Sequence, residues 1–207
     1  ASNALLASRI SFMNEMAAIC EKVGADIEAV RKGVGSDRRI GPAFLFAGLG
    51  YGGSCFPKDV RALSHVARSL GLTAPICAAV DAVNLRQHGA FLPLIEAEFG
   101  ANLTGRVFAL WGLAFKPRTD DVREAPALHM ARELVKRGAK VVAFDPEAME
   151  SARREAGDLV TYADGRDAVG RGSEFRVVGR SVQRDRGPFA RQRLGRREPD
   201  AARRAGD

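Results

Sequence analysis

Two short apolar runs, RVFALWG at residues 106–112 and KVVAF at residues 140–144, decide the fold class of this chain. The segment between them has helical spacing, with Leu128 and Leu134 on one face. A strand, a helix and a strand within about 40 residues form a βαβ unit, which requires a parallel sheet. We therefore predict an α/β domain over residues 104–169.

The first half of the chain predicts helices only. Apolar residues recur at spacings of three and four over residues 6–23, and Asp26 suits the cap of a second helix. Pro57 and Pro75 suit the first turns of a third and a fourth helix, whereas Pro93 is expected to kink or end the fourth. Residues 1–103 are therefore predicted as an all-helical domain.

The last segment, residues 170–207, has a different composition and no clear period. It holds eleven arginines and five acidic residues, so 11 − 5 = +6 of the chain's net charge of +7 lies there. Two explanations stay open, namely a disordered basic tail and a reading-frame error. In either case we predict no further strand, and the apolar edge of the sheet is expected to be exposed.

Composition excludes several classes of protein. The hydrophobic share of 46% and the charged share of 28% are ordinary for a globular protein. No apolar run approaches the roughly 18 residues of a membrane span, and no signal peptide is recognised. The three cysteines have no metal-ligand spacing, and their odd number suits a reducing compartment, so a cytoplasmic protein without a metal site is expected.

The segment GLGYGGSCFPKD, residues 48–59, carries the chemistry. It places Cys55 immediately before a helix, where unpaired N–H groups and a partial positive charge favour a thiolate. Lys58 can add to that field, and Asp59 lies about one helical turn further on. A thiolate beside a carboxylate suits covalent catalysis through a thioester. A cysteine alone would be explained as a buried residue in a tight turn, but these neighbours favour a catalytic cysteine.

The same segment contains a misleading pattern. Gly48, Gly50 and Gly53 match G-x-G-x-x-G, the fingerprint of a dinucleotide-binding loop. No strand of suitable length precedes it, and Cys55 and Pro57 interrupt the place where the phosphate-binding helix would begin. We therefore reject a dinucleotide site here.

Over about residues 1–168 the chain closely resembles the UDP-glucose/GDP-mannose dehydrogenase family. The segments that carry the resemblance stand in family order: NEMAAICEKVGAD, DRRIGPAFLFAGLGYGGSCFPKDVRAL, WGLAFKPRTDDVREAPAL and KVVAFDP. The serine before Cys55 and the following FPKD are similar to the UDP-glucose branch, and GDP-mannose or another nucleotide sugar stays open as the substrate.

This resemblance implies an NAD-dependent four-electron oxidation of UDP-glucose to UDP-glucuronate. Cys55 would form a thiohemiacetal and then a thioester, Asp59 would position or activate water, and Asn3 would hold a substrate oxygen and water. It also implies that the helical domain pairs two subunits and that the α/β domain is a partial Rossmann-like, UDP-binding domain. The family's N-terminal NAD-binding domain is not recognised here, so a fragment that is inactive alone is expected.

The resemblance assigns further residues to binding. Those implied to contact the nucleotide sugar are Phe44, Arg39, Tyr51, Gly52 and Lys116, and those implied to contact NAD are Lys58 and Arg123. Arg39 would reach the nucleotide sugar of the partner subunit, although a solvated loop arginine is an equal alternative.

Two other classes of function were weighed. A non-catalytic dimerisation module stays open. A nucleic-acid binder that uses the basic tail is disfavoured, because the first 169 residues are nearly neutral and the tail has only Phe175 and Phe189 for stacking. Cys20 and Cys77 are predicted as core residues, and His65, His88 and His129 as ordinary helix residues.

Overall fold

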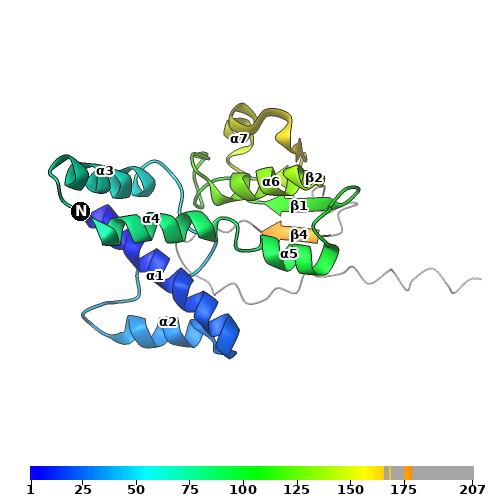
Figure 1. Cartoon of the computed structure of the whole chain (residues 1–207). Helices are drawn as coiled ribbons and strands as arrows, with labels where there is room; N and C mark the ends of the chain where they lie inside the picture. The colour runs from blue at the N-terminus through cyan, green and yellow to red at the C-terminus, as the bar shows by residue number, and fades with distance from the viewer. Residues whose placement is uncertain (166–167, 169–174, 179–207) are drawn as a thin grey trace, which may run out of the picture.

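The computed structural model describes residues 1–165, 168 and 175–178, and it has the predicted mixed α/β character (Figure 1). The described helices, one of them a 3-10 helix, are α1 (Ser2–Val23), α2 (Ile27–Ser36), α3 (Phe56–Ser69), α4 (Pro75–Gln87), α5 (Leu92–Phe99), α6 (Pro126–Lys136), α7 (Met149–Ala156) and η1 (Gly157–Leu159). The described strands are β1 (Val107–Trp111), β2 (Lys140–Phe144), β3 (Thr161–Tyr162) and β4 (Phe175–Val178). Most of the predicted tail, residues 170–207, lies outside the described residues.

Local signals explain where the first helices begin and end. Gly24 ends α1 in the left-handed conformation, with φ of 73°, which costs glycine little. The side chain of Asp26 accepts a hydrogen bond of 2.9 Å from the backbone N–H of Glu28 and so caps α2. Pro57 and Pro75 lie in the first turns of α3 and α4, as predicted.

Pro93 has a different role from the one predicted. The fourth helix ends at Gln87, before the proline, and Pro93 lies in the first turn of a separate helix, α5. Proline is well tolerated there because the first turn needs no N–H from it. The proline therefore begins a helix and does not end one.

The four described strands form one parallel sheet in the order β3-β2-β1-β4. The predicted βαβ unit is confirmed, with Val107 of β1 opposite Lys140 of β2. The prediction that no strand follows residue 170 is wrong, because β4 pairs with the other edge of β1. Its four residues, FRVV, are too short to show a period among the surrounding arginines and glycines. The edge that was expected to be exposed is therefore covered.

Two main cores hold the molecule together, and Figure 1 shows the corresponding elements side by side. In the sheet part, which we define as residues 92–178, Phe108 and Leu110 point to one face of β1 and pack with residues of α5 and α6. In the helical part, residues 2–87, the core is formed by Ala4, Ala7, Ile10, Tyr51, Val60 and Val80. The segment that contains Cys55 touches both cores, since its Leu49 packs in the first and its Tyr51 in the second. None of the described helices has the length and apolar character needed to cross a membrane.

Candidate active site

Cys55 is the residue immediately before α3, and its side chain is exposed. The sulfur does not cap the helix, and its recorded neighbour is the hydroxyl of Ser54, with Oγ 3.7 Å from Sγ. The backbone carbonyl of Cys55 accepts the first hydrogen bond of the helix, 2.9 Å from the N–H of Asp59. A free sulfur therefore lies at the positive end of a helix of 14 residues and is open to a reaction partner.

The structure brings Asn3 and Asp59, both predicted to be catalytic, into contact, and Lys58, predicted to contact NAD, lies beside Asp59. Asn3 Nδ2, from the start of α1, donates a hydrogen bond of 2.7 Å to Asp59 Oδ2, in the first turn of α3. Lys58 Nζ lies 3.1 Å from Asp59 Oδ1. The Asn3 hydrogen bond, followed by that of Lys58, holds the pKa of Asp59 below its ordinary value. Asp59 is thus a fixed carboxylate at neutral pH, one turn from Cys55.

Aromatic side chains form one wall next to this segment. The ring of Phe44 lies 5.9 Å from that of Phe56, and the Tyr51 ring meets Phe56 edge-on at 5.7 Å. Phe44 has a positive φ of 59°, which is unusual for a residue with a side chain and turns it toward the helical core. Burial, followed by the nearby Asp81, raises the pKa of the Tyr51 hydroxyl, so this phenol stays neutral.

The glycines before Cys55 lie in close contact with another part of the protein. This contact agrees with the rejection of a dinucleotide-binding loop. A Cβ on Gly52 would lie 2.2 Å from the carbonyl oxygen of Glu124, and one on Gly53 would lie 2.7 Å from the Phe115 ring. The N–H of Gly53 also donates a hydrogen bond of 2.7 Å to the carbonyl of Arg123. The space that a pyrophosphate would need beside Gly52 and Gly53 is therefore filled by the loop between β1 and α6.

That loop carries two of the predicted binding residues. Lys116 is exposed, with its Nζ 5.2 Å from the centre of the Phe115 ring. Arg123 is also exposed and pairs with Asp121 at 2.7 Å. This pairing is the main cause that raises the pKa of Arg123. The backbone carbonyl of Arg123 accepts the hydrogen bond from Gly53, so the residue lies beside the cysteine segment.

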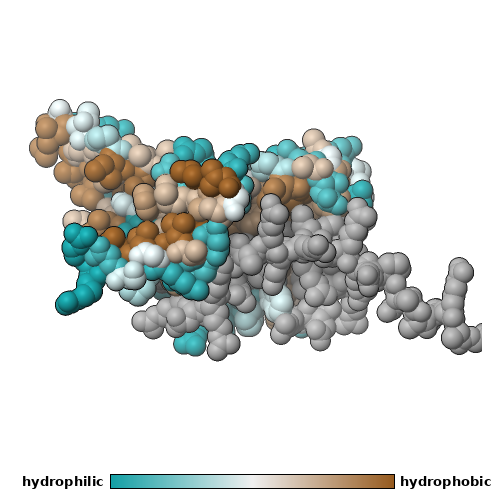
Figure 2. Space-filling view, turned by 90° about the horizontal axis from the view of Figure 1, so that it is seen from below, coloured by the Kyte–Doolittle hydropathy of each residue, from teal (hydrophilic) through white to brown (hydrophobic). Residues whose placement is uncertain are grey.

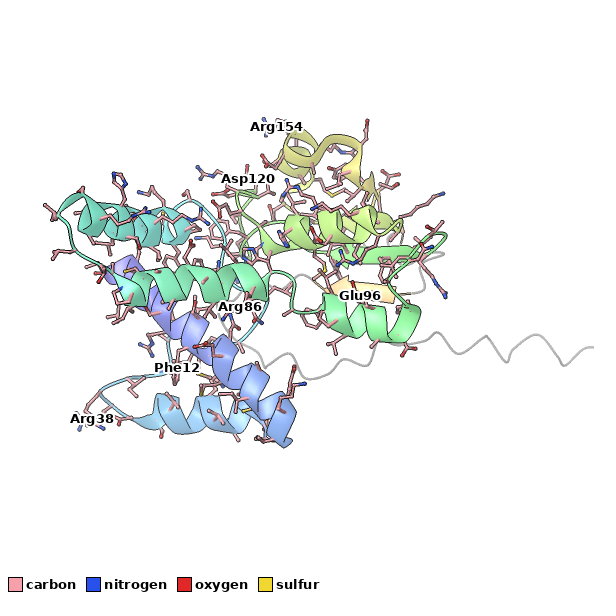
Figure 3. The ribbon with its side chains drawn as sticks, in the orientation of Figure 1. Phe12, Arg38, Arg86, Glu96, Asp120 and Arg154 are labelled. Carbon is pink, nitrogen blue, oxygen red and sulfur yellow. The ribbon has the colours of Figure 1, made fainter. Side chains whose placement is uncertain are left out.

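Arg39 is the predicted residue that the structure leaves apart from the others. Its side chain is 89% exposed and pairs with Asp37 at 2.6 Å, in the loop after α2. Figure 3 shows the neighbouring Arg38 where this loop leaves α2, away from α3. A contact with a site in another subunit is compatible with this position, and a contact with Cys55 of the same chain is not observed.

Residues that the sequence did not single out hold the site in place. Arg61 of α3 pairs with Asp81 of α4 at 3.2 Å and with Glu124 at 2.7 Å, so it joins three segments around the cysteine. His88, predicted as an ordinary helix residue, is buried, with its Nε2 3.2 Å from the carbonyl oxygen of Tyr51. A polar residue within an apolar helix was the only signal available for such roles.

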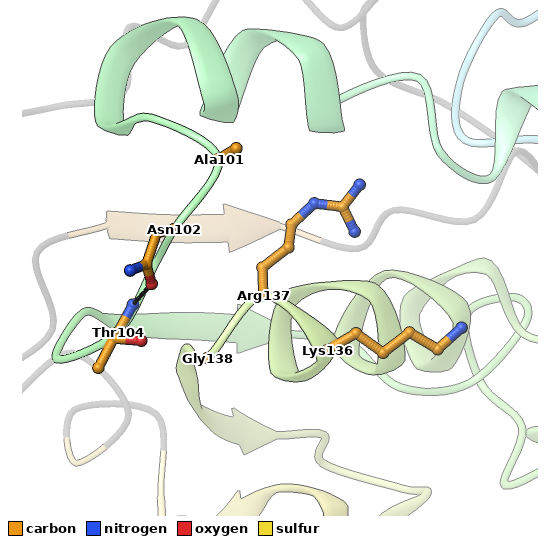
Figure 4. Close-up of a pocket in the computed structure, with 6 residues that line it drawn as sticks. All are labelled: Ala101, Asn102, Thr104, Lys136, Arg137 and Gly138. Atoms are coloured by element: carbon orange, nitrogen blue, oxygen red, sulfur yellow. Dashed lines mark hydrogen bonds between the residues drawn. The ribbon is translucent and has the colours of Figure 1, made fainter.

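The hollow drawn in Figure 4 is separate from this site. It has a volume of about 490 Å³ and is lined by Ala101, Asn102, Thr104, Lys136, Arg137 and Gly138. These residues lie at the C-terminal end of α6, whereas Glu124 and the cysteine segment lie at its N-terminal end. Both cations of the hollow are paired with carboxylates, Lys136 with Glu133, and Arg137 with Glu133 and Glu96. Among the described residues, no group of three or more His, Cys, Asp or Glu side chains could hold a metal ion.

Comparison with known proteins agrees with this arrangement. Residues 1–86 match the central domain of the UDP-glucose/GDP-mannose dehydrogenase family, and residues 109–183 match the UDP binding domain of the same family. The second match extends past β4, beyond the predicted limit at residue 169.

Individual relatives are similar over most of this chain. A UDP-glucose 6-dehydrogenase of Pseudomonas aeruginosa is 54% identical over 148 residues, which are 72% of this chain and 33% of the relative. One of Bacillus subtilis is 45% identical over 178 residues, or 86% of this chain and 40% of the relative. The solved UDP-glucose dehydrogenase of Pyrobaculum islandicum superposes with a TM-score of 0.83 at 42% identity, covering 90% of this chain and 44% of that one. The chain thus spans less than half the length of these relatives.

Proposed function

Because this chain belongs to the UDP-glucose/GDP-mannose dehydrogenase family, we propose that it supplies the catalytic cysteine and part of the nucleotide-sugar site of an NAD-dependent UDP-glucose 6-dehydrogenase. The observation that supports this most is the exposed Cys55 at the start of α3, with Asp59 fixed by Asn3 one turn away. The names of the relatives favour UDP-glucose as the sugar nucleotide. GDP-mannose is the alternative within the family.

The proposed reaction oxidises the C6 alcohol of the sugar in two steps. Loss of a hydride from C6 and of a proton from its hydroxyl gives an aldehyde. The Cys55 sulfur adds to the aldehyde carbon, and the carbonyl oxygen takes up a proton to give a thiohemiacetal. Loss of a second hydride from C6, and of the proton from the new hydroxyl, converts this adduct into a thioester on Cys55. Water then attacks the thioester carbon, the thiolate of Cys55 leaves, and the uronate is released. An oxidised nicotinamide supplies the chemistry of accepting each hydride.

Asp59 has the geometry for the hydrolytic step. Because the hydrogen bond from Asn3 lowers the pKa of Asp59, its carboxylate is a hydrogen-bond acceptor at neutral pH. It can orient a water and stabilise the positive charge that develops on this water during the attack. Its side chain is 30% exposed, so water can reach it. The Asn3 amide fixes the carboxylate and still has one N–H and one oxygen for substrate or water.

The exposed cations of the site would contact the charged groups of NAD and of the nucleotide sugar. Lys58 is next to Asp59, and the backbone carbonyl of Arg123 accepts a hydrogen bond from Gly53, so both residues fit contacts with NAD. Lys116, on the same loop as Arg123, fits a contact with the nucleotide sugar. Phe44, Tyr51 and Gly52 would form the wall beside the sugar, and Arg39 would serve the site of a second subunit.

An apolar surface on the helical part supports a homodimer. Leu63 and Val66 of α3, and Leu70 directly after it, lie on one face, and this face is exposed. Leu72 and Ile76, which follow in the chain, are exposed as well, Ile76 by 73%. Figure 2, seen from below and therefore from the side opposite α3, shows that hydrophobic surface also gathers elsewhere on the helical part. Exposed apolar surface of this kind marks interaction sites. This observation also favours the second candidate, a module that pairs subunits without catalysis.

The experiment that tests the catalytic proposal is protection of Cys55 from alkylation by nucleotide sugars. The full chain is labelled with iodoacetamide, and peptide mapping separates Cys55 from Cys20 and Cys77. We expect UDP-glucose to slow the labelling of Cys55 alone, and GDP-mannose to have little effect. Equal labelling with and without UDP-glucose would contradict the proposed site in this chain. Protection by GDP-mannose alone would assign the alternative substrate.

We also propose that the protein works in the cytoplasm. All three cysteines are free, although Cys20 is buried and Cys77 is partly buried. A protein whose cysteines are all free, one of them reactive, suits a reducing compartment.

A further inference from the structure

One side chain of α4 binds the backbone of the cysteine segment on both sides of a single residue. Asn84 Oδ1 accepts a hydrogen bond of 2.7 Å from the N–H of Tyr51, and Asn84 Nδ2 donates one of 2.9 Å to the carbonyl oxygen of Tyr51. Asn84 is 2% exposed, so water cannot replace either bond at little cost. This amide therefore fixes both the position and the orientation of the peptide units around Tyr51.

Gly50 shows that the close approach is built into the segment. A Cβ at this position would lie 2.6 Å from Asn84 Oδ1 and 3.0 Å from the His88 ring, closer than real contacts allow. Gly50 also has φ of 94°, a conformation that side chains rarely adopt. Both the close approach of Asn84 and this backbone conformation therefore favour glycine at position 50.

Neighbouring residues extend the same attachment. Gln87 Nε2 donates a hydrogen bond of 2.7 Å to the carbonyl of Gly48, and the N–H of Gly48 donates one of 2.8 Å to Asn14 Oδ1. His88 Nε2 lies 3.2 Å from the Tyr51 carbonyl. Burial lowers the pKa of His88, which keeps the imidazole neutral at physiological pH. Asn84 is the member of this group that contacts both the N–H and the carbonyl of one residue.

Three residues separate Tyr51 from Cys55, and the middle one, Gly53, is held by the hydrogen bond from its N–H to the Arg123 carbonyl. We propose that Asn84 is a positioning residue for the nucleophile: by clamping Tyr51 it sets the place where the segment enters α3, and with it the orientation of Cys55 Sγ at the helix N-terminus. This inference rests on the proposed function, because it assigns Asn84 a role through Cys55. Asn84 itself does not touch the sulfur.

The test uses two readouts on the full chain, hydrogen exchange of the segment 48–56 and the alkylation rate of Cys55. In Asn84→Ala we expect the Tyr51 amide to exchange about tenfold faster or more, because its acceptor is lost in a buried place. We also expect Cys55 to be alkylated several-fold more slowly at pH 7, because the sulfur is no longer held at the helix N-terminus.

Two further variants keep the test decisive. Ser11→Ala is the matched control, since the Ser11 hydroxyl is buried and bonds the carbonyl of Val80 on α4 without contacting the segment. It is expected to change stability but neither readout. Asn84→Asp is almost isosteric and retains the acceptor for the Tyr51 N–H while losing the donor to its carbonyl. We expect this variant to show faster exchange and slower alkylation, each to a smaller extent than Asn84→Ala. It replaces Asn84→Ala in the test if that variant does not fold.

Each result has a defined meaning. Unchanged exchange of residues 48–56 in a folded Asn84 variant would overturn the inference, whatever the alkylation rate. Faster exchange with unchanged alkylation would also overturn it, because the clamp would then not set the sulfur. Slow alkylation of Cys55 in the unsubstituted chain, without protection by UDP-glucose, would contradict the proposed function, and the exchange comparison would still decide whether Asn84 holds the segment.

Discussion

The helical part and the sheet part of the described chain are built on unequal cores. The sheet part gathers its largest buried side chains, among them Phe108, Leu110 and Leu128, into one cluster around β1 and α6. The helical part has a small core of mostly alanine and valine, and apolar residues of α3 and α4 remain exposed. The catalytic candidates lie on the weakly packed part. The difference indicates that the stability of the helical part depends on its neighbours. One neighbour is the sheet part, which it contacts through Arg61, and another is a partner at the exposed apolar face of α3.

The largest effect is expected from a cavity in the sheet core. Phe108→Ala should destabilise the chain by about 3–5 kcal/mol, because a fully buried aromatic ring is lost. Denaturant unfolding followed by the fluorescence of Trp111, the only tryptophan, reports directly on β1. Leu72→Ala is the control, since Leu72 is exposed and should change stability by less than about 0.5 kcal/mol. Equal losses in the two variants would contradict the contrast between the parts.

A smaller effect is expected where the sheet part supports the site. The carboxylate of Asp145, at the end of β2, accepts hydrogen bonds from the backbone N–H groups of Leu113, Ala114, Glu147 and Ala148. Asp145→Ala should cost about 2–4 kcal/mol, because it leaves these donors without partners. It should also loosen the loop that carries Lys116.

The contribution of Asp145 to the free energy of unfolding decreases at low pH. Burial alone would raise the pKa of Asp145, but the four N–H donors outweigh it and hold the pKa below its ordinary value. The stabilisation is therefore full above the unfolded-state pKa of about 4 and is lost as the pH falls through the folded-state value. Unfolding measured from pH 7 to pH 3 should show a steeper loss in the unsubstituted chain than in Asp145→Ala. Parallel curves would rule out this role.

The smallest effect on stability, with a large effect on association, is expected at the exposed apolar face. Ile76→Asp should change the free energy of unfolding by less than about 0.5 kcal/mol, because the side chain is exposed. It should nevertheless weaken self-association, because a charge would be buried in the interface. Light scattering over a concentration series measures this. Leu94→Asp, on an exposed position of α5 in the sheet part, is the matched control and should leave the oligomeric state unchanged.

The sequence predicted those features that depend on local pattern. The βαβ unit is visible because β1, α6 and β2 have clear periods, and Gly24 and Asp26 carry recognisable signals for a helix end and a helix start. It did not predict β4, whose pairing with β1 is a tertiary contact of four residues. Nor did it predict that Pro93 would begin a helix, because a proline fits both the end of one helix and the first turn of the next.

The candidate site was predictable in its reactive residues and less so in its support. Cys55 and Asp59 stand four residues apart, so their proximity follows from helix geometry. Asn3 is 56 residues from Asp59, and only the resemblance to a family indicated that they meet. Asn84 and His88 gave only a weak signal, as polar residues in an apolar stretch. A polar residue on a helix is usually solvated, and burial against a loop depends on the whole fold.

The central claim is that Cys55 is the reactive cysteine of this chain, and the most direct measurement is its alkylation rate in the full chain at pH 7. We predict that Cys55 is alkylated at least about tenfold faster than the thiol of a model peptide, because its sulfur is exposed at the positive end of α3. A rate equal to that of the model thiol would contradict the account.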